Sequence, residues 1–204
     1  QSLPTADPLL LKGLRVPKAY TSLGIMTTDC DDVGYAALDE ATKKADVRVV
    51  YAKSMYGGSS NASTKLAGEF IGILAGTSPA EVRAGVEAAT LYIQRDAAFY
   101  SANEDDSIVY FAHCIASSGS YLSREAEILP GEAIAYLIAP PAEAVVAMDA
   151  ALKAADVKLK KFYGPPSETN FGGGLLTGDQ AACKAACEAF GDKVCRMAQN
   201  PIET

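Results

Sequence analysis

The chain contains an internal duplication, and this repeat limits its fold more than any other feature of the sequence. Residues 36–50 (AALDEATKKADVRVV) match residues 146–160 (VAMDAALKAADVKLK) at an offset of 110, since 146 − 36 = 110. A second match pairs residues 81–89 with residues 182–190 at an offset of 101, since 182 − 81 = 101. The second copy is therefore nine residues shorter between the matches (110 − 101 = 9), a change that a surface loop tolerates because loop closure costs little per added residue. The repeat predicts two related modules in tandem, with an internal loop of different length in each.

Both copies have the residue pattern of an α/β module: strand, helix, strand, loop, strand, helix. Asp31 or Asp32 is expected to cap the first helix of the first copy, and Ser78-Pro79 to open its second helix. Gly178 or Asp179 is expected to cap the last helix. The expected strands cover residues 22–28, 47–56, 66–75, 108–115, 133–139, 157–163 and 175–177, with a weaker one over 9–16, and the first helix of each copy ends near residues 45 and 155.

Composition favours a folded protein of two domains. The 204 residues suffice for two domains of about 100 residues, with a boundary near 103–106 that predicts domains over 1–104 and 105–204. Apolar residues make up 49% and charged residues 21%, which is typical of globular proteins. The net charge of −7, with dispersed lysines and arginines, disfavours nucleic acid and anionic membranes as partners.

The compartment is predicted from what the sequence lacks. No apolar run approaches the roughly 20 residues that span a bilayer, and no secretory signal is recognisable. Five cysteines are an odd number without the spacing of a disulfide framework, which fits a reducing compartment. We therefore predict a cytoplasmic protein.

One motif is compatible with catalysis. Asp29-Cys30-Asp31-Asp32-Val33 follows an apolar strand and fits the D-x-D-x-V pattern of magnesium-dependent phosphatases, in which Asp29 and Asp31 would be nucleophile and acid/base. The competing interpretation is that these carboxylates accept hydrogen bonds from backbone N–H groups at the start of the helix. The second copy has Ala139-Pro140-Pro141 at the equivalent place, so the module folds without the acids. The phosphatase stays the less favoured alternative.

The cysteines and the single histidine predict no catalytic or metal site. His113 and Cys114 are neighbours in a strand, so their side chains point to opposite faces and cannot form a catalytic pair. Cys183 and Cys187 align with Val82 and Val86, which cannot bind a metal, and are expected in the core. We predict neither a metal nor a cofactor.

Several segments resemble one family. The stretches ALKAADVKL and NFGGGLLTGDQAACKAACEAF resemble the bacterial microcompartment (BMC) shell domain. The stretches DCDDV, DEATK, GSYLS, PPSETNF and TGDQAACKAAC resemble the EutL group of tandem shell proteins, which includes EutL of ethanolamine compartments and EtuB of ethanol-utilising ones. The resemblance implies an α/β fold of the α+β, ferredoxin-like kind, with two tandem, circularly permuted BMC domains, each a small sheet flanked by helices.

The resemblance also implies a function. A structural, non-enzymatic shell protein of an ethanolamine- or ethanol-utilising microcompartment would form a homotrimer with the shape of a pseudohexagonal tile. The expected partners are other shell proteins of the same compartment and small metabolites that pass a loop-gated pore. A small-molecule-sensing regulatory trimer is the alternative, because duplicated ferredoxin-like modules also bind effectors.

The resemblance assigns residues to three kinds of site. By position, Lys43 and Lys153 fall at the tile edge, although each could instead be a solvated lysine at a helix end. Asp31, Asp32 and Glu69 match acidic residues that, in ethanolamine-type members, bind the amine substrate in a small pore within each subunit. In an ethanol-utilising compartment these acids would be only structural.

The loops of unequal length, 56–65 and 166–174, border the central pore in this group. Phe171 is expected to line or plug the pore, or else to pack back on its own domain. The expected pore-lining residues are Tyr56, Gly57, Gly58, Ser59, Ser60, Asn61, Asn170, Phe171, Gly172 and Gly173.

Overall fold

The computed structural model of the chain describes residues 1–55, 70–165 and 170–200. These residues form two compact units, which we describe separately. Unit 1 comprises Gln1–Ala97 and the short segment Gly119–Leu122, and unit 2 comprises Ala98–Ser118 and Ser123–Thr204. The segment Gly119–Leu122 therefore belongs to unit 1, although it lies between two stretches of unit 2 in the sequence.

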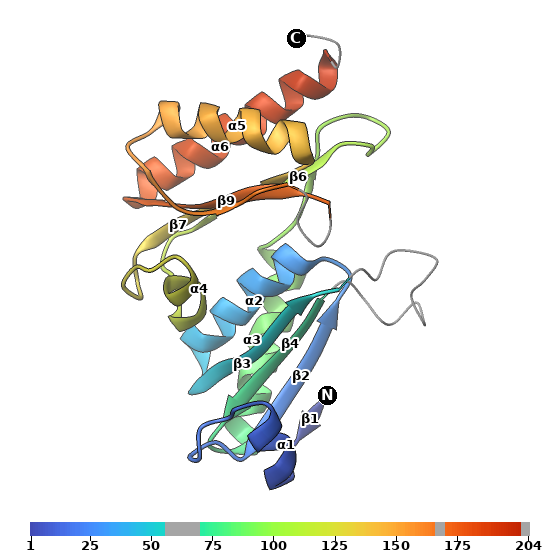
Figure 1. Ribbon diagram of the computed structural model, residues 1–204, viewed down its shortest axis with the longest axis vertical. Coiled ribbons are helices and arrows are strands. Elements are labelled where there is room, and N and C mark those ends of the chain that lie inside the picture. The colour runs from blue at the N-terminus through green and yellow to red at the C-terminus, as the bar shows by residue number, and fades with distance from the viewer. Residues whose placement is uncertain (56–69, 166–169, 201–204) are drawn as a thin grey trace. The chain divides into compact units, whose positions relative to one another are not determined.

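Unit 1 is a four-stranded antiparallel sheet with the order β1-β2-β4-β3 (Figure 1). Its elements are β1 (Ser2–Leu3), α1 (Pro8–Gly13), β2 (Ser22–Thr28), α2 (Asp31–Lys44), β3 (Val47–Ser54), β4 (Phe70–Gly76) and α3 (Pro79–Arg95). The helices α2 and α3 pack on each other and on the sheet. Leu23 and Ile73 lie in a second cluster with Leu11 and Leu14, so the α1 region covers strands of the same sheet.

Unit 2 is a five-stranded antiparallel sheet with the order β5-β6-β7-β9-β8, and α5 and α6 lie together along it (Figure 1). Its elements are β5 (Tyr100–Ser101), β6 (Val109–Ile115), α4 (Ser120–Glu125, of which the first three residues belong to unit 1), β7 (Ala133–Ala139), α5 (Pro141–Ala154), β8 (Lys158–Tyr163), β9 (Gly172–Gly178) and α6 (Gln180–Gln199). The core joins small residues of β7 to Met148 of α5 and to Cys183, Cys187 and Phe190 of α6. The prediction that these two cysteines are core residues is confirmed.

The duplication is visible in the backbone. Helices α2 and α5 each have 14 residues and end at Ala45 and Ala155, whose φ and ψ angles are −146° and 156° in the first case and −147° and 156° in the second. The register of β3 shifts between Val49 and Tyr51, and that of β8 shifts between Leu159 and Lys161, again at an offset of 110 (159 − 49 = 110). The two copies therefore share their irregularities as well as their strand order.

One predicted strand is wrong. Residues 9–16 were expected as a weak strand, but residues 8–13 form the helix α1. Pro8 lies at the start of this helix, where its fixed φ is favourable, and the Asp7 carboxylate accepts a hydrogen bond from Leu9 N at 2.8 Å. The Asp7 cap and Pro8 favour a helix over the strand that the apolar run suggested.

The predicted helix caps are confirmed for α3 and α6 but not for α2. Ser78 and Asp179 cap α3 and α6 as expected, accepting from Glu81 N and Ala182 N. The N-cap of α2 is Cys30, which forms no side-chain cap hydrogen bond, while Asp31 is the first helical residue. Asp31 instead accepts from the adjacent Asp32 N at 2.9 Å.

The secondary structure predicted for two glycines of the pore loop is also wrong. Gly172 and Gly173 were expected in a loop, but they begin β9 and pair with Ala139 and Ile138 of β7. Gly173 has φ +150°, and a Cβ there would lie 1.9 Å from the Leu137 carbonyl oxygen. The glycines are therefore required by close strand approach.

Candidate functional site

Two buried carboxylates stand at the start of α2. Asp31 and Asp32 are only 7% and 6% exposed. Asp31 accepts two hydrogen bonds, from Asp32 N and from the Ser54 hydroxyl at 2.7 Å. Because the N-terminus of a helix carries a partial positive charge, this position favours negative side chains.

The surroundings of Asp31 contain two residues that the sequence analysis did not select. The Tyr35 hydroxyl lies 2.9 Å from Ser54 Oγ, and since Ser54 gives its proton to Asp31, Tyr35 donates to Ser54. The Tyr35 ring also packs edge-on against Phe70, with centroids 4.7 Å apart. The spacing of Asp31 and Tyr35 by four residues on one helix was the available signal for this network.

Burial keeps the neighbouring groups protonated. It raises the pKa of the Cys30 thiol to about 12, and the carboxylates of Asp32 and Asp31 add to that shift. Burial also raises the pKa of Tyr35, and the charge of Asp31 acts in the same direction. The Asp31 carboxylate therefore has the neutral hydroxyls of Ser54 and Tyr35 on one side, and the Cys30 thiol stays protonated. Two buried carboxylates beside neutral groups suit a small cation.

The third predicted member of this site and part of the pore lie outside the described residues. Glu69 belongs to this group, and so do the first-copy pore residues Tyr56, Gly57, Gly58, Ser59, Ser60 and Asn61.

The pore residues of the second copy are described. Asn170 has φ +65°, a left-handed conformation that asparagine tolerates. The Phe171 ring lies edge-on to Phe99 of the same unit, with centroids 6.0 Å apart. Gly172 and Gly173 are buried in β9. Phe171 thus has an aromatic neighbour in its own unit, and its role at a pore stays a prediction.

The two predicted tile-edge lysines each form an ion pair on their own helix. Lys43 Nζ lies 2.5 Å from Glu40 Oε2 on α2, and Lys153 Nζ lies 2.7 Å from Asp149 Oδ2 on α5. Both lie in the last turn, where a positive charge is favoured by the helix dipole. Their place at a tile edge stays a prediction.

The two aspartates of the phosphatase motif, Asp29 and Asp31, lie in different surroundings. Asp29 is exposed, whereas Asp31 is buried and hydrogen-bonded. The His113 ring stacks on Phe111 at a centroid distance of 5.3 Å. Within residues 1–55, 70–165 and 170–200, no group of three or more His, Cys, Asp or Glu residues could hold a metal ion.

Unit 2 has a separate surface groove of about 370 Å³ between β5, β6 and α6. Tyr100, Tyr110, Lys184 and Glu188 are among its lining residues, and Cys195 Sγ donates a weak hydrogen bond to the Tyr110 hydroxyl at 3.8 Å. Burial is the main cause that raises the pKa of Tyr110 to about 12. The groove contains none of the site residues predicted from the sequence.

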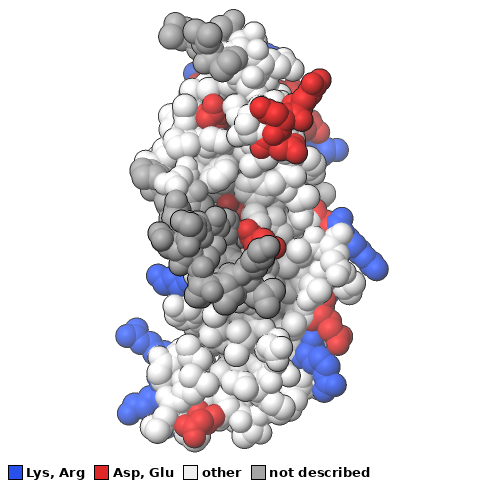
Figure 2. All heavy atoms as spheres, turned by 90° about the vertical axis from the view of Figure 1, so that its right-hand side faces the viewer, with Lys and Arg blue, Asp and Glu red and all other residues white. Residues whose placement is uncertain are grey.

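On the face drawn in Figure 2, acidic and basic side chains are interspersed among uncharged ones, and the described residues there form no continuous basic patch. None of the helices within the described part of the chain is long and apolar enough to cross a membrane.

Comparisons with known proteins agree with this fold. The family described as BMC domain matches residues 22–103 and 138–202. The bacterial microcompartment shell protein EutL of Clostridium perfringens is 61% identical over 196 residues, which cover 96% of this chain and 90% of that protein. The crystal structure of the ethanolamine utilization protein EutL from Leptotrichia buccalis is 62% identical with a TM-score of 0.97, and the match covers 100% of this chain and 94% of that one.

A more distant structure is similar in fold alone. EtuB from Clostridium kluyveri is 20% identical with a TM-score of 0.76, over 98% of this chain and 87% of that chain. The Clostridium perfringens relative is named as a bacterial microcompartment shell protein, which argues against the phosphatase and sensor alternatives. The chain therefore belongs to the BMC-domain family, within its EutL group, and is a structural shell protein of a bacterial microcompartment and not an enzyme.

Proposed function

We propose that three copies of this shell protein form a pseudohexagonal tile, which joins other shell proteins around an ethanolamine-utilising compartment and passes small metabolites through a loop-gated pore. The observation that carries the proposal is the duplication itself. Each chain supplies two units with the same order of core strands, β2-β4-β3 and β7-β9-β8. Six similar modules arranged about a threefold axis need three such chains, since closed cyclic symmetry requires identical contacts around the ring.

The relatives support the metabolic assignment. The proteins that are 61% and 62% identical are named EutL, and one is called an ethanolamine utilization protein, whereas EtuB is only 20% identical. Ethanolamine is therefore favoured over ethanol as the metabolite of the compartment. Passage would follow the predicted pore residues, of which Asn170, Phe171, Gly172 and Gly173 are described.

The tile proposal is tested by assembly. Light scattering at rising protein concentration should give the mass of three chains, and electron microscopy at higher concentration should show flat hexagonal sheets. A protein that remains a single chain, or a trimer that binds an effector and never forms sheets, would contradict it.

We further propose that Asp31 and Asp32, with Glu69, bind the ammonium group of ethanolamine. Both described carboxylates are buried at one helix end, and Ser54 and Tyr35 provide neutral hydrogen-bonding groups beside them. A buried carboxylate attracts a cation strongly because water screens the charge less there.

Calorimetry separates charge recognition from non-specific binding. Ethanolamine should release or absorb heat on binding, while ethylene glycol, which has the same size and no charge, should not. Asp32→Asn should weaken the binding at least tenfold, and Asp149→Asn, on the exposed surface of α5, should leave it unchanged. Equal heats for ethanolamine with the wild type and Asp32→Asn, or none with the wild type, would overturn this part of the proposal.

A further inference from the structure

Helices α1 and α4 are the same structural element in the two copies, although their sequences are only weakly similar. Each has six residues, and they are related by an offset of 112 (120 − 8 = 112). Val16 N donates to Leu11 O at 2.9 Å, and Ile128 N donates to Ser123 O at 3.0 Å, at that same offset.

A residue that follows each of the two helices supports this equivalence. Arg15 and Glu127, again 112 residues apart, both have left-handed backbones, with φ 55° and φ 52°. Residues 6–16 therefore correspond to residues 118–128, position by position.

The two helices differ in what covers them. Tyr121 and Leu122 of α4 are 8% and 2% exposed, whereas their counterparts Leu9 and Leu10 of α1 are 79% and 43% exposed. The apolar pair on α4 is thus buried, whereas the equivalent pair on α1 is exposed to solvent.

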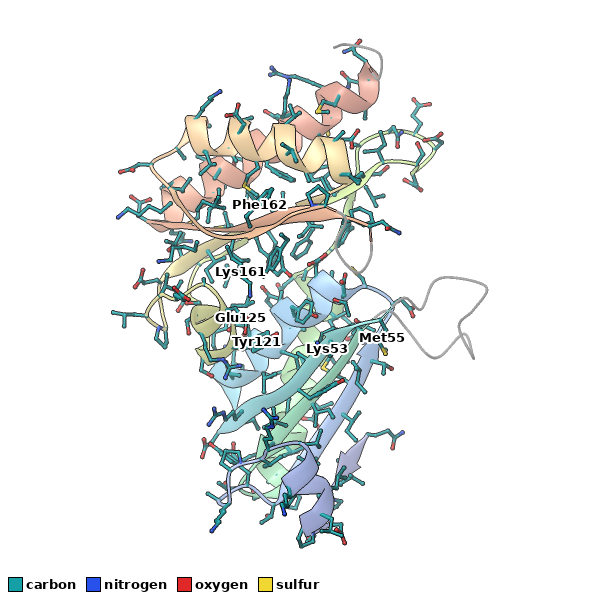
Figure 3. The ribbon with its side chains drawn as sticks, in the orientation of Figure 1. Lys53, Met55, Tyr121, Glu125, Lys161 and Phe162 are labelled. Atoms are coloured by element: carbon teal, nitrogen blue, oxygen red, sulfur yellow. The ribbon has the colours of Figure 1, made fainter. Side chains whose placement is uncertain are left out.

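The cover of the α4 pair is helix α2. Tyr121, labelled in Figure 3, stacks on Tyr35 with ring centroids 6.3 Å apart. Asp39 of α2 accepts from Gly119 N at 2.6 Å and from Leu122 N at 2.8 Å, and Thr42 Oγ1 accepts from Ser120 N at 3.0 Å. All these residues belong to unit 1.

The face of α5 that corresponds to the α4-binding face of α2 carries exposed apolar residues. At the offset of 110, Tyr35 and Ala36 of α2 correspond to Val145 and Val146 of α5. Val145 and Val146 are 49% and 40% exposed, whereas Ala36 is 1% exposed. The chain therefore forms the contact between α4 and α2 internally. The equivalent surfaces on α1 and α5 are both exposed.

We infer that α1 of one subunit docks on α5 of a second copy of this chain, with Leu9 and Leu10 covering Val145 and Val146 as Tyr121 and Leu122 cover α2. The inference rests on the proposed homotrimer and names a contact that holds its subunits together. Each subunit presents both halves on different surfaces, so the contact is heterologous and closes into a ring only if the rotation between copies permits it. Burial of four exposed apolar side chains supplies a driving force that needs no charge.

Polar groups are arranged differently in the α4–α2 contact within the chain and on the α1 and α5 surfaces. In α1 the Asp7 carboxylate accepts from Leu9 N, whereas the second copy has Gly119 at the position of Asp7 and therefore no side chain that could form this cap. Asp149, the counterpart of Asp39, pairs with Lys153 on its own helix. The contact between subunits is therefore mainly apolar.

A disulfide across the predicted contact tests the inference directly. The double variant Leu9→Cys/Val145→Cys, oxidised in the assembled state, should give covalent dimers and trimers on a non-reducing denaturing gel. Each single variant controls for the natural cysteines. Leu129→Cys/Val145→Cys is the matched control, because Leu129 is 72% exposed but lies outside α1.

Light scattering on the same samples separates the inference from the homotrimer. A trimer in which Leu9→Cys/Val145→Cys links no more than its controls would overturn the docking of α1 on α5 and leave the homotrimer standing. A single-chain mass for the wild type would overturn both. Leu9→Asp should also shift the wild-type trimer to smaller species with unchanged circular dichroism, whereas Leu129→Asp should not. A Leu9→Asp variant that stays trimeric would contradict the inference.

Discussion

Asp39 and Asp149 occupy the same position of the two duplicated helices, yet one is buried and the other is not. Asp39 is 1% exposed and binds the backbone N–H groups of Gly119 and Leu122, while Asp149 pairs with Lys153 on the surface. The same residue type at the same helical position thus has a structural role in one copy and little role in the other.

The Asp39→Ala variant should be clearly destabilised. Removing this acceptor leaves two buried N–H groups without a partner, which costs about 3 kcal/mol. The apparent Tm should fall by roughly 6–12 °C for a chain of this size. Thermal melts at one fixed protein concentration provide the measurement.

Asp149→Ala is the matched control for that variant. Its ion pair is exposed, so its loss should change the free energy of unfolding by less than about 0.5 kcal/mol. Equal falls in Tm for the two variants would contradict the assigned role of Asp39.

The stability due to Asp39 should depend on pH. Burial raises the pKa of its carboxyl, and the N–H groups of Gly119 and Leu122 and the charge of Lys43 offset only part of that shift. The native state therefore holds the Asp39 proton to a higher pH than the unfolded chain, whose carboxyl has a pKa near 4. The resulting stabilisation is full below about pH 4 and is lost as the pH rises through the raised native pKa.

The comparison with Asp39→Asn isolates this effect, because asparagine carries no such proton. The Tm of the wild type minus that of Asp39→Asn should be largest in acid and should shrink toward neutral pH. A difference that grows as the pH rises from about 2 to about 5 would show that the native pKa is lowered instead.

Gly173→Ala should destabilise unit 2. A Cβ at this position would lie 1.9 Å from the Leu137 carbonyl oxygen, and the φ of +150° is unfavourable for alanine. The clash with backbone in a paired strand should cost about 3 kcal/mol or more. Gly164→Ala, whose Cβ would have only a 3.6 Å contact with Phe162, should melt within a few degrees of the wild type in the same thermal scan.

Cys30 should be almost inert in the folded protein. A thiol with a pKa of about 12 has roughly a thousandfold less thiolate at pH 8 than an ordinary cysteine, and the thiolate is the species that reacts. Alkylation with iodoacetamide, followed by peptide mass spectrometry, should label Cys30 rapidly in guanidinium and very slowly in buffer. Similar rates in both solutions would place Cys30 in contact with water.

Much of the fold is local and could be predicted from the sequence. The offset of 110 fixes the equivalence of α2 with α5, and Ser78 and Asp179 act as caps because their side chains reach N–H groups only three residues away. The acidic pair Asp31 and Asp32 was identified because the sequence around it resembles the EutL group, in which matching acidic residues line a small pore. Ser54 was not identified, because it reaches Asp31 from a strand 23 residues later.

The sequence by itself determined the duplication, the order of helices and strands within the repeated part of each copy, and the family. Only the tertiary structure decided that α1 is the counterpart of α4, because the side chains are only weakly similar while backbone hydrogen bonds and left-handed residues recur at an offset of 112. It also decided that Asp39 is buried and Asp149 exposed. Burial depends on which distant segment packs on a helix, and Gly119 lies 80 residues away from Asp39 in the chain.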